Sequence, residues 1–309
     1  MSQPIVALVG ATASGKSGLS LDLAERLGGE IGGEVVNTDA MQVYRGMDIG
    51  TAKLPPAERR GVAHHLLDLL DVTEPSTVAL FQGWARAAID EIRDRGATPV
   101  LVGGSALYTR AIVDRFEFPG TDESLRRELE AELERVGGHA LHERLSGVDP
   151  EAAAVIAPDN GRRVVRALEV IALTGRPYSA SLPRLEYADP LTVQIGVDID
   201  RPTLDDRIAR RVDQMFAAGF VEEVEALLGR GLAEGLTAQR AIGYREVIGF
   251  LAGDRTLAEA VEQTKTATRR FARRQDGWFR KDPRIVWVAH DDPDRVDRAL
   301  AAIDALDHA

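Results

Sequence analysis

The residues best placed to do chemistry lie near the N-terminus, in the stretch Gly-Ala-Thr-Ala-Ser-Gly-Lys-Ser. It satisfies the pattern G-x-x-x-x-G-K-[ST], in which backbone N–H groups and a helix N-terminus surround one anion. Lys16 supplies a mobile positive charge for the terminal phosphate, and the Ser17 hydroxyl is a ligand for Mg²⁺. The stretch therefore predicts a bound phosphate chain, without saying which molecule carries it. It consists of Gly10, Ala11, Thr12, Ala13, Ser14, Gly15, Lys16 and Ser17.

A carboxylate, Asp39, stands directly after a second apolar stretch. In an open α/β sheet the ends of the strands line the ligand crevice, so Asp39 can face the phosphate site as a general base. A helix N-cap is the other interpretation of this position. No apolar strand ends in a convincing Walker-B aspartate, since Pro99–Val102 is followed by Gly-Gly-Ser. This absence disfavours an ordinary P-loop kinase or nucleotide hydrolase.

The elements that must hold these residues alternate between strand and helix. Ile5–Val9 is a continuous apolar run, typical of a strand buried on both faces of a parallel sheet. Thr192–Ile199 alternates apolar and polar residues and leads into a helix that Thr203 is expected to cap. We predict strands at 5–9, 34–38, 99–102 and 192–199, and helices at 18–27 and 77–95. This order indicates an α/β fold, a P-loop parallel sheet flanked by helices.

The pattern changes near Pro119. Thr121–Val136 is helical, with Leu125, Leu129 and Leu133 on one stripe. From there to about Pro190 the sequence shows helical pieces separated by Gly and Pro. We therefore predict a catalytic core of residues 1–118 and 190–309, interrupted by an α-helical insertion at 119–189.

Composition narrows the class of protein. The chain has 309 residues, no cysteine and a formal net charge of −11. Disulfides and thiolate metal sites are excluded, which is compatible with the cytoplasm. No basic region precedes the first apolar run, and no apolar stretch approaches the length of a membrane span, so we expect neither a signal peptide nor a membrane partner. Although the net charge disfavours nucleic acid, residues 269–284 carry seven basic and two acidic side chains. A solvated helix face would show the same clustering.

Seven ordered motifs resemble a known family. They are GATASGKS, NTDAMQVYRGMDIGTAK, HHLLD, LVGGSALY, RRVVRALEV, RAIGYREV and TRRFARRQDGWFR, and the resemblance extends from Pro4 to about Val288. Together they are similar to the bacterial tRNA dimethylallyltransferases, also called isopentenylpyrophosphate:tRNA transferases. That family transfers the dimethylallyl group of dimethylallyl diphosphate to N6 of adenosine 37, just 3′ of the anticodon. The resemblance implies Mg²⁺ as cofactor, a tRNA anticodon stem-loop as partner, and a cytoplasmic enzyme. No obligate protein partner is evident, and we expect a monomer.

The resemblance also assigns residues. Asp39 corresponds to the general base at N6, and Ser105 stands where the family usually has a threonine close to the target base. Arg211 corresponds to a further ligand of the diphosphate, beside the eight residues of the loop, and Ser17 lies near Mg²⁺. The tRNA-contacting set is Asp39, Ala40, Met41, Gln42, Ser105, Arg126, Arg162, Arg163, Val164, Val165, Arg166, Arg240, Gly243, Tyr244 and Arg245.

The sequence departs from the family at a few positions. Ala40 replaces the usual serine after the base, Ser105 keeps a hydroxyl, and Phe271 stands where tyrosine is common. His64 and His65 are adjacent and so do not predict a metal site. Two other readings stay open from the residues alone: a P-loop small-molecule kinase, and an RNA-binding P-loop protein without enzymatic activity, in which Asp39 has no chemical role.

Overall fold

The computed structural model describes residues 2–27, 32–116, 118–181 and 185–308. The chain divides into two compact units, one of Met1–Val113 with Asp189–Ala309 and one of Asp114–Ala188. Within the described residues, no helix combines the length and apolarity that a membrane crossing requires.

A parallel sheet organises the larger unit. Six strands of the described chain form it in the order β3-β2-β4-β1-β5-β6, and every neighbouring pair is parallel. Their bounds are β1 Ile5–Val9, β2 Gly33–Asn37, β3 His64–His65, β4 Thr98–Val102, β5 Thr192–Asp198 and β6 Ile285–Ala289. The predicted α/β class is confirmed, and so are the four predicted strands. The sequence patterns did not indicate β3 and β6.

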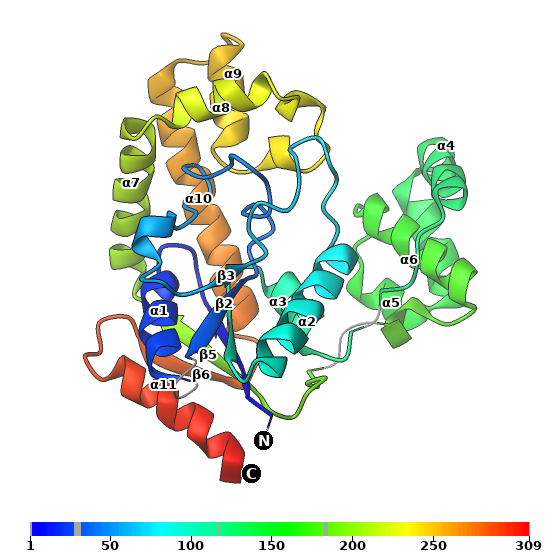
Figure 1. The fold of residues 1–309 in the computed structure, drawn as a ribbon. Helices are drawn as coiled ribbons and strands as arrows, with labels where there is room; N and C mark the ends of the chain where they lie inside the picture. The colour runs from blue at the N-terminus through cyan, green and yellow to red at the C-terminus, as the bar shows by residue number, and fades with distance from the viewer. Residues whose placement is uncertain (1, 28–31, 117, 182–184, 309) are drawn as a thin grey trace. The chain divides into compact units, whose positions relative to one another are not determined.

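Helices cover both faces of this sheet (Figure 1). On one face, α1 and α11 bury an apolar core that includes Leu19, Leu23 and Ile303 against β1, β4 and β5. On the other face, α2 and α3 pack against the strands, and the end of α10 contributes Phe279 to a cluster with Val9. The bounds are α1 Lys16–Arg26, α2 Val78–Asp94, α3 Ala106–Val113, α10 Leu257–Phe279 and α11 Arg295–Asp304.

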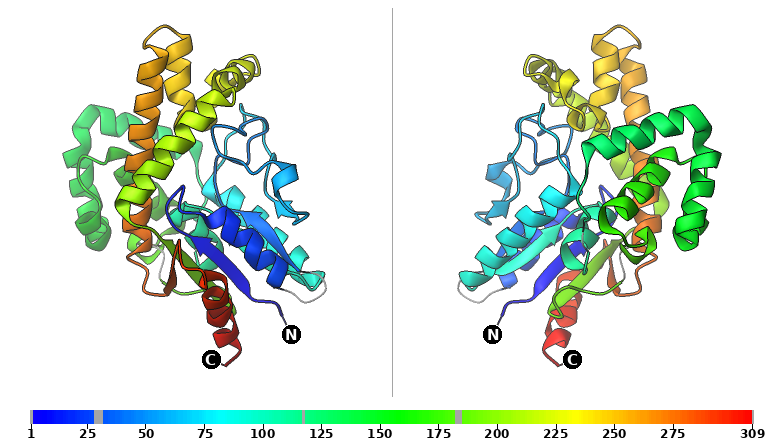
Figure 2. Two further views of the ribbon diagram at one scale, coloured as in Figure 1. Left: turned by 90° about the vertical axis from the view of Figure 1, so that its left-hand side faces the viewer. Right: turned by 90° about the vertical axis from the view of Figure 1, so that its right-hand side faces the viewer.

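The helices α7, α8, α9 and α10 pack on one another beyond the carboxyl ends of the strands (Figure 2). Asp200 caps α7, because its side chain accepts a hydrogen bond from the Thr203 N–H at 3.0 Å. The expectation that Thr203 itself is the cap was therefore wrong, since Arg201-Pro202 already form the first helical turn. The bounds are α7 Arg201–Ala217, α8 Phe220–Leu228 and α9 Tyr244–Leu251.

The smaller unit is helical and has its own core. Gly137 divides its first helix, because its φ of 82° and ψ of 163° lie outside the helical region and suit glycine. Leu145 and Val164, both 0% exposed, lie at the centre of the core. The bounds are α4 Glu123–Val148, α5 Pro150–Val155 and α6 Gly161–Thr174.

We expect Leu145→Ala to lower the free energy of unfolding of the smaller unit by about 2–5 kcal/mol, because it leaves a cavity in a closed apolar core. Val148→Ala on the same helix is the matched control, since Val148 is 52% exposed, and it should cost less than about 0.5 kcal/mol. Urea unfolding followed by circular dichroism measures both. Fluorescence of the three tryptophans, Trp84, Trp278 and Trp287, follows the larger unit separately. A loss for Leu145→Ala as small as that of the control would contradict this account of the core.

Candidate active site

The predicted phosphate loop joins β1 to α1. Gly15 precedes the helix with a φ of 104°, and no side chain of the described residues caps the helix N-terminus, so its first N–H groups can meet an anion. Lys16 is 9% exposed, and its Nζ donates a hydrogen bond to the Ala11 carbonyl at 2.6 Å. Burial, helped by the Arg211 charge and opposed by Asp39, lowers the pKa of Lys16 from 10.5 to about 7. A bound anion would raise this pKa again.

Asp39 follows β2 at the same edge of the sheet. Its N–H donates to Asn37 Oδ1 at 2.9 Å, and its own Oδ1 accepts the Met41 N–H at 2.8 Å. These two bonds fix the carboxylate in a tight turn. Burial raises the pKa of Asp39, while the N–H groups of Met41 and Gln42 and the charge of Lys16 oppose the shift. A carboxylate with a raised pKa is a better proton acceptor than an ordinary surface aspartate.

Two cavities meet at Asp39. The smaller, about 200 Å³, is lined by phosphate-loop residues, among them Lys16 and Ser17. The larger, about 460 Å³, extends between α7, α8 and α10 over apolar side chains such as Met215 and Phe220. Residues that line both are Thr12, Ala13, Asp39, Thr51, Ala52, Arg211 and Gln275. A polar compartment and an apolar one thus share a wall that contains a carboxylate and a guanidinium.

Arg211 brings a second cation to this junction from α7. Its pKa is lowered by burial and by the nearby Arg207 charge. Arg207 is itself engaged, with Nη1 donating to the Ser14 carbonyl at 3.4 Å and Nη2 lying 3.2 Å from His290 Nδ1. The buried Lys16 and the half-buried Arg211 therefore form a cationic pair with Asp39 as the nearby counter-charge, an arrangement that favours an anionic ligand.

Gln275 on α10 is a site residue that the sequence analysis did not single out, although it lies within the motif TRRFARRQDGWFR. It is 6% exposed; its Oε1 accepts the Thr12 N–H at 2.8 Å, and its Nε2 donates to the Gly104 carbonyl at 2.8 Å. A Cβ on Gly104 would lie 2.2 Å from Gln275 Nε2, so a side chain there would displace the Gln275 amide. One amide thereby joins the phosphate loop to Ser105, which lines the larger cavity.

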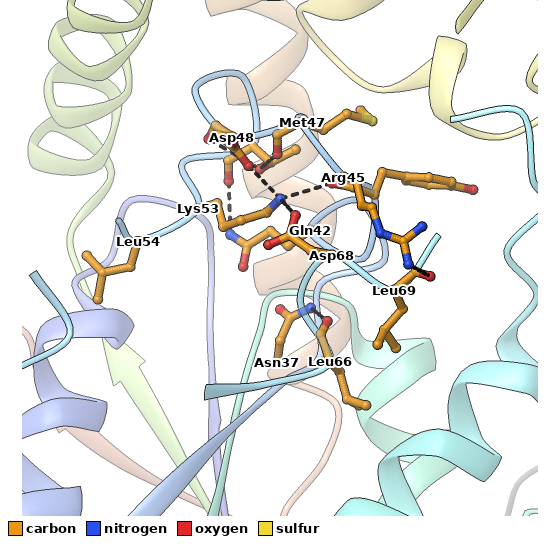
Figure 3. Close-up of polar contacts among 12 residues, drawn as sticks. Asn37, Gln42, Arg45, Met47, Asp48, Lys53, Leu54, Leu66, Asp68 and Leu69 are labelled. Atoms are coloured by element: carbon orange, nitrogen blue, oxygen red, sulfur yellow. Dashed lines mark hydrogen bonds and ion pairs between the residues drawn. The ribbon is translucent and has the colours of Figure 1, made fainter. Parts of the chain in front are cut away.

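The segment after Asp39 folds around Lys53, a second residue that sequence reasoning missed (Figure 3). The Lys53 Nζ donates to the Tyr44 carbonyl at 2.9 Å and to Asp48 Oδ1 and Asp68 Oδ1, both at 2.6 Å. Lys53 is only 8% exposed, so the two carboxylates neutralise a buried charge. Asp68 belongs to the HHLLD motif, which gives that motif a structural role.

The predicted tRNA-contacting residues of the larger unit lie in different environments. Ala40, Met41, Ser105, Arg240 and Tyr244 line the larger cavity. Gln42 lines the smaller one and donates through Nε2 to the Thr51 carbonyl at 3.1 Å. Gly243 packs against Phe220, and Arg245 pairs with the buried Glu246, its Nη2 lying 2.5 Å from Oε1. The segment thus forms cavity wall at Tyr244 and exposed surface at Arg245.

In the smaller unit, the Glu169 carboxylate binds two of the arginines predicted to contact tRNA. It is 0% exposed and accepts hydrogen bonds from Arg126 Nη2 and Arg166 Nη1, both at 2.8 Å. Val164 and Val165, at 0% and 3% exposure, pack in the core of that unit, so their side chains face away from solvent. Arg162 and Arg163 are exposed. The exposed positive charge of this stretch therefore comes from these two residues.

The basic stretch at 269–284 is also divided. Arg270, Arg273 and Arg274 are exposed on α10. In contrast, Arg280 pairs with Asp198 and Asp276, and Arg284 pairs with Asp282. Trp278 is 56% exposed and carries the Lys281 ammonium 5.5 Å from its ring centre. Exposed cations beside an exposed indole are a combination that can bind RNA.

The metal expectation concerns Ser17. Ser17 lines the smaller cavity, at the start of α1. The described residues hold no cluster of three or more His, Asp or Glu side chains that could bind a metal alone. Mg²⁺ at Ser17 would thus take most of its ligands from phosphate oxygens and water, which is a common mode for this ion.

Comparisons with known proteins agree with this geometry. The IPP transferase family model matches residues 42–282. A tRNA dimethylallyltransferase of a Nocardioides species is 73% identical over 302 residues, which cover 98% of this chain and 96% of that protein. The tRNA dimethylallyltransferase of Thermobifida fusca is 56% identical over 300 residues, 97% of this chain and 94% of its own length.

Solved structures agree as well. The tRNA isopentenylpyrophosphate transferase of Bacillus halodurans is 42% identical with a TM-score of 0.71, covering 99% of this chain and 100% of that one. A eukaryotic dimethylallyltransferase, solved while acting on tRNA, is 28% identical with a TM-score of 0.82 over 97% of this chain and 77% of its own. With the family model matching most of its length and a relative at 73% identity over nearly all of it, the chain belongs to the IPP transferase family.

Proposed function

We propose that this enzyme transfers the dimethylallyl group of dimethylallyl diphosphate to tRNA, at N6 of adenosine 37 on the 3′ side of the anticodon, and releases diphosphate. The observation that supports this best is the position of Asp39. It lies where a cationic phosphate cavity opens into an apolar cavity of about 460 Å³. A kinase of small molecules, the alternative from the residues alone, is not favoured, because relatives over nearly the whole chain are tRNA dimethylallyltransferases.

The reaction needs assistance at both ends. The N6 lone pair of adenine is delocalised into the ring, so N6 is a poor nucleophile. As the new C–N bond forms, the N6 proton passes to the Asp39 carboxylate. The bond between C1 of the dimethylallyl group and its diphosphate oxygen breaks with its electron pair on oxygen. Lys16, Arg211 and the N–H groups of the phosphate loop stabilise that growing charge. Apolar walls around Met215 and Phe220 suit the hydrocarbon.

Ser17 would hold Mg²⁺ against the diphosphate, and the bound ion would further neutralise the leaving group. The adenine must leave the anticodon loop to reach Asp39. Arg162 and Arg163 of the helical insertion at 119–189, together with the exposed arginines of α10, are the proposed contacts to the anticodon stem-loop. With a tRNA and a small diphosphate as substrates, we place the reaction in the cytoplasm and propose that a monomer performs it.

We expect Asp39→Asn to slow transfer by about 10²–10⁴-fold, since the amide keeps the shape of the carboxylate but is a negligible base. Single-turnover rates with prebound tRNA measure this effect, and the tRNA dissociation constant of the same variant is the control. Because burial raises the pKa of Asp39, the wild-type rate should also fall on acidification at a higher pH than an exposed aspartate would give. An Asn variant within about threefold of wild type would show that another group accepts the proton.

The lowered pKa of Lys16 gives a second test. Inorganic pyrophosphate needs the protonated ammonium, so above a pH of about 7 its association constant should fall by up to about tenfold per pH unit as Lys16 loses its proton. Lys16→Arg is the reference, because arginine stays charged over this pH range. Pyrophosphate ionises equally in both titrations, so its ionisation cancels in the ratio of the two association constants. Isothermal titration calorimetry from pH 6 to pH 9 gives the ratio of the two constants. A ratio that does not change with pH would show that Lys16 does not bind the phosphate groups.

Lys16→Ala should abolish transfer.

Charge reversal should separate RNA binding from chemistry. We expect Arg162→Glu with Arg163→Glu, and separately Arg270→Glu with Arg273→Glu, to weaken tRNA binding and to reduce its salt slope by about one per lost phosphate contact. Arg26→Glu is the control, because Arg26 ends α1 away from the phosphate loop and pairs with Asp297 at the surface. Filter binding at several salt concentrations gives the slopes. Unchanged salt slopes in both double variants would show that these arginines do not contact the RNA and are only solvated residues on helix faces.

A further inference from the structure

Glu223, in the first turn of α8, binds three successive backbone amides of another segment. Its Oε2 accepts the N–H groups of Asp48 at 3.1 Å and Ile49 at 2.6 Å, and its Oε1 accepts that of Gly50 at 3.2 Å. The Tyr244 hydroxyl adds a fourth bond, donating to Oε1 at 2.6 Å. Burial, followed by the negative charge of Glu223, raises the pKa of Tyr244, which keeps that hydroxyl protonated as a donor. Charge-assisted bonds of this kind are stronger than neutral ones.

The segment that Glu223 holds is part of the site. Gly50, Thr51 and Ala52 line the larger cavity, and Thr51 and Ala52 line the smaller one as well. The packing leaves no freedom at Gly50, where a Cβ would lie 2.2 Å from Phe220 and 2.5 Å from Tyr244. The position of these residues therefore depends on α8 and α9.

The same segment is connected to the base. Gln42 Nε2 donates to the Thr51 carbonyl at 3.1 Å, and Gln42 stands three residues after Asp39. At its ends, the segment is closed on itself by Lys53 and Asp48 (Figure 3). Asp48 thus contacts two charged residues of opposite sign. Its carboxylate accepts a hydrogen bond from Lys53, and its N–H donates one to Glu223. A displacement at Asp48–Gly50 would be transmitted to the wall beside Asp39.

We propose that Glu223 is a positioning residue for the transfer step: it fixes the Gly50–Ala52 wall, and through it the relative placement of the dimethylallyl carbon, the adenine and Asp39. This inference rests on the proposed function. Its expected effect is on alignment, because the amides that Glu223 binds belong to Asp48, Ile49 and Gly50, and Gly50 lines the larger cavity, not the one that contains Lys16. Misplacement of reacting groups by about 1 Å can slow a reaction by about 10²-fold.

The test compares Glu223→Gln with Glu222→Gln. The second substitution removes the same charge from the neighbouring residue, which is exposed on the same helix turn. We expect Glu223→Gln to lower the single-turnover rate by about 10- to 100-fold, while the inhibition constant of inorganic pyrophosphate stays within about twofold of wild type. Glu222→Gln should match wild type in both. A rise in the pyrophosphate constant as large as the loss in rate would overturn the assignment, because it would mean general damage to the site.

A readout that needs no substrate distinguishes this inference from the proposed function. Amide hydrogen exchange at Asp48, Ile49 and Gly50 should accelerate in Glu223→Gln and stay at the wild-type rate in Glu222→Gln. If wild type transferred no dimethylallyl group, the proposed function would fail, while exchange would still decide whether Glu223 holds the wall. Glu223→Asp keeps the charge on a shorter side chain and replaces the Gln variant if that variant does not fold. Its transfer rate and its amide exchange rates should lie between those of wild type and Glu223→Gln. Wild-type exchange and wild-type rate in a folded variant would overturn the role of Glu223.

Discussion

Two cations and one carboxylate are held together at one edge of the sheet, and the rest of the larger unit keeps them there. Lys16, Arg211 and Asp39 come from three different elements, and burial opposes the charged form of each. Such a cluster is unfavourable in an empty protein, because the two cations repel and only one counter-charge is near. A diphosphate relieves that repulsion, so binding of the donor raises the free energy of unfolding.

The sequence indicated the parts of this site that are local in the chain. A phosphate loop, its strand and its helix are contiguous, and Asp39 follows a strand, so pattern and spacing were sufficient. The residues that join distant segments gave no such signal. Gln275 meets Thr12 across 263 positions, and Glu223 meets Gly50 across 173. β3 has only two residues, so it showed no run long enough to predict. β6 is an apolar run of five residues, the same length as β1, so the sequence carried a signal there that the prediction did not use.

The resemblance predicts tRNA contacts for whole stretches, and the side chains within one stretch lie in different environments. Within 162–166, two arginines are exposed, two valines are core and the last arginine is bound to Glu169. The pKa of Glu169 shows the balance: burial alone would raise it, but the bonds from Arg126 and Arg166 hold it below its ordinary value. The charges of Arg126 and Arg166 thus stabilise the helical unit by neutralising Glu169. Any contact that these arginines make with RNA has to compete with their bonds to Glu169.

Because the two cavities share a wall of seven residues, their occupants must be close enough to be joined by a covalent link. A compound that carries a diphosphate mimic at one end and a purine at the other would place each end in its own compartment. Linking the two ends raises the effective concentration of the second once the first has bound. Such a bisubstrate inhibitor would occupy both compartments of this site at once.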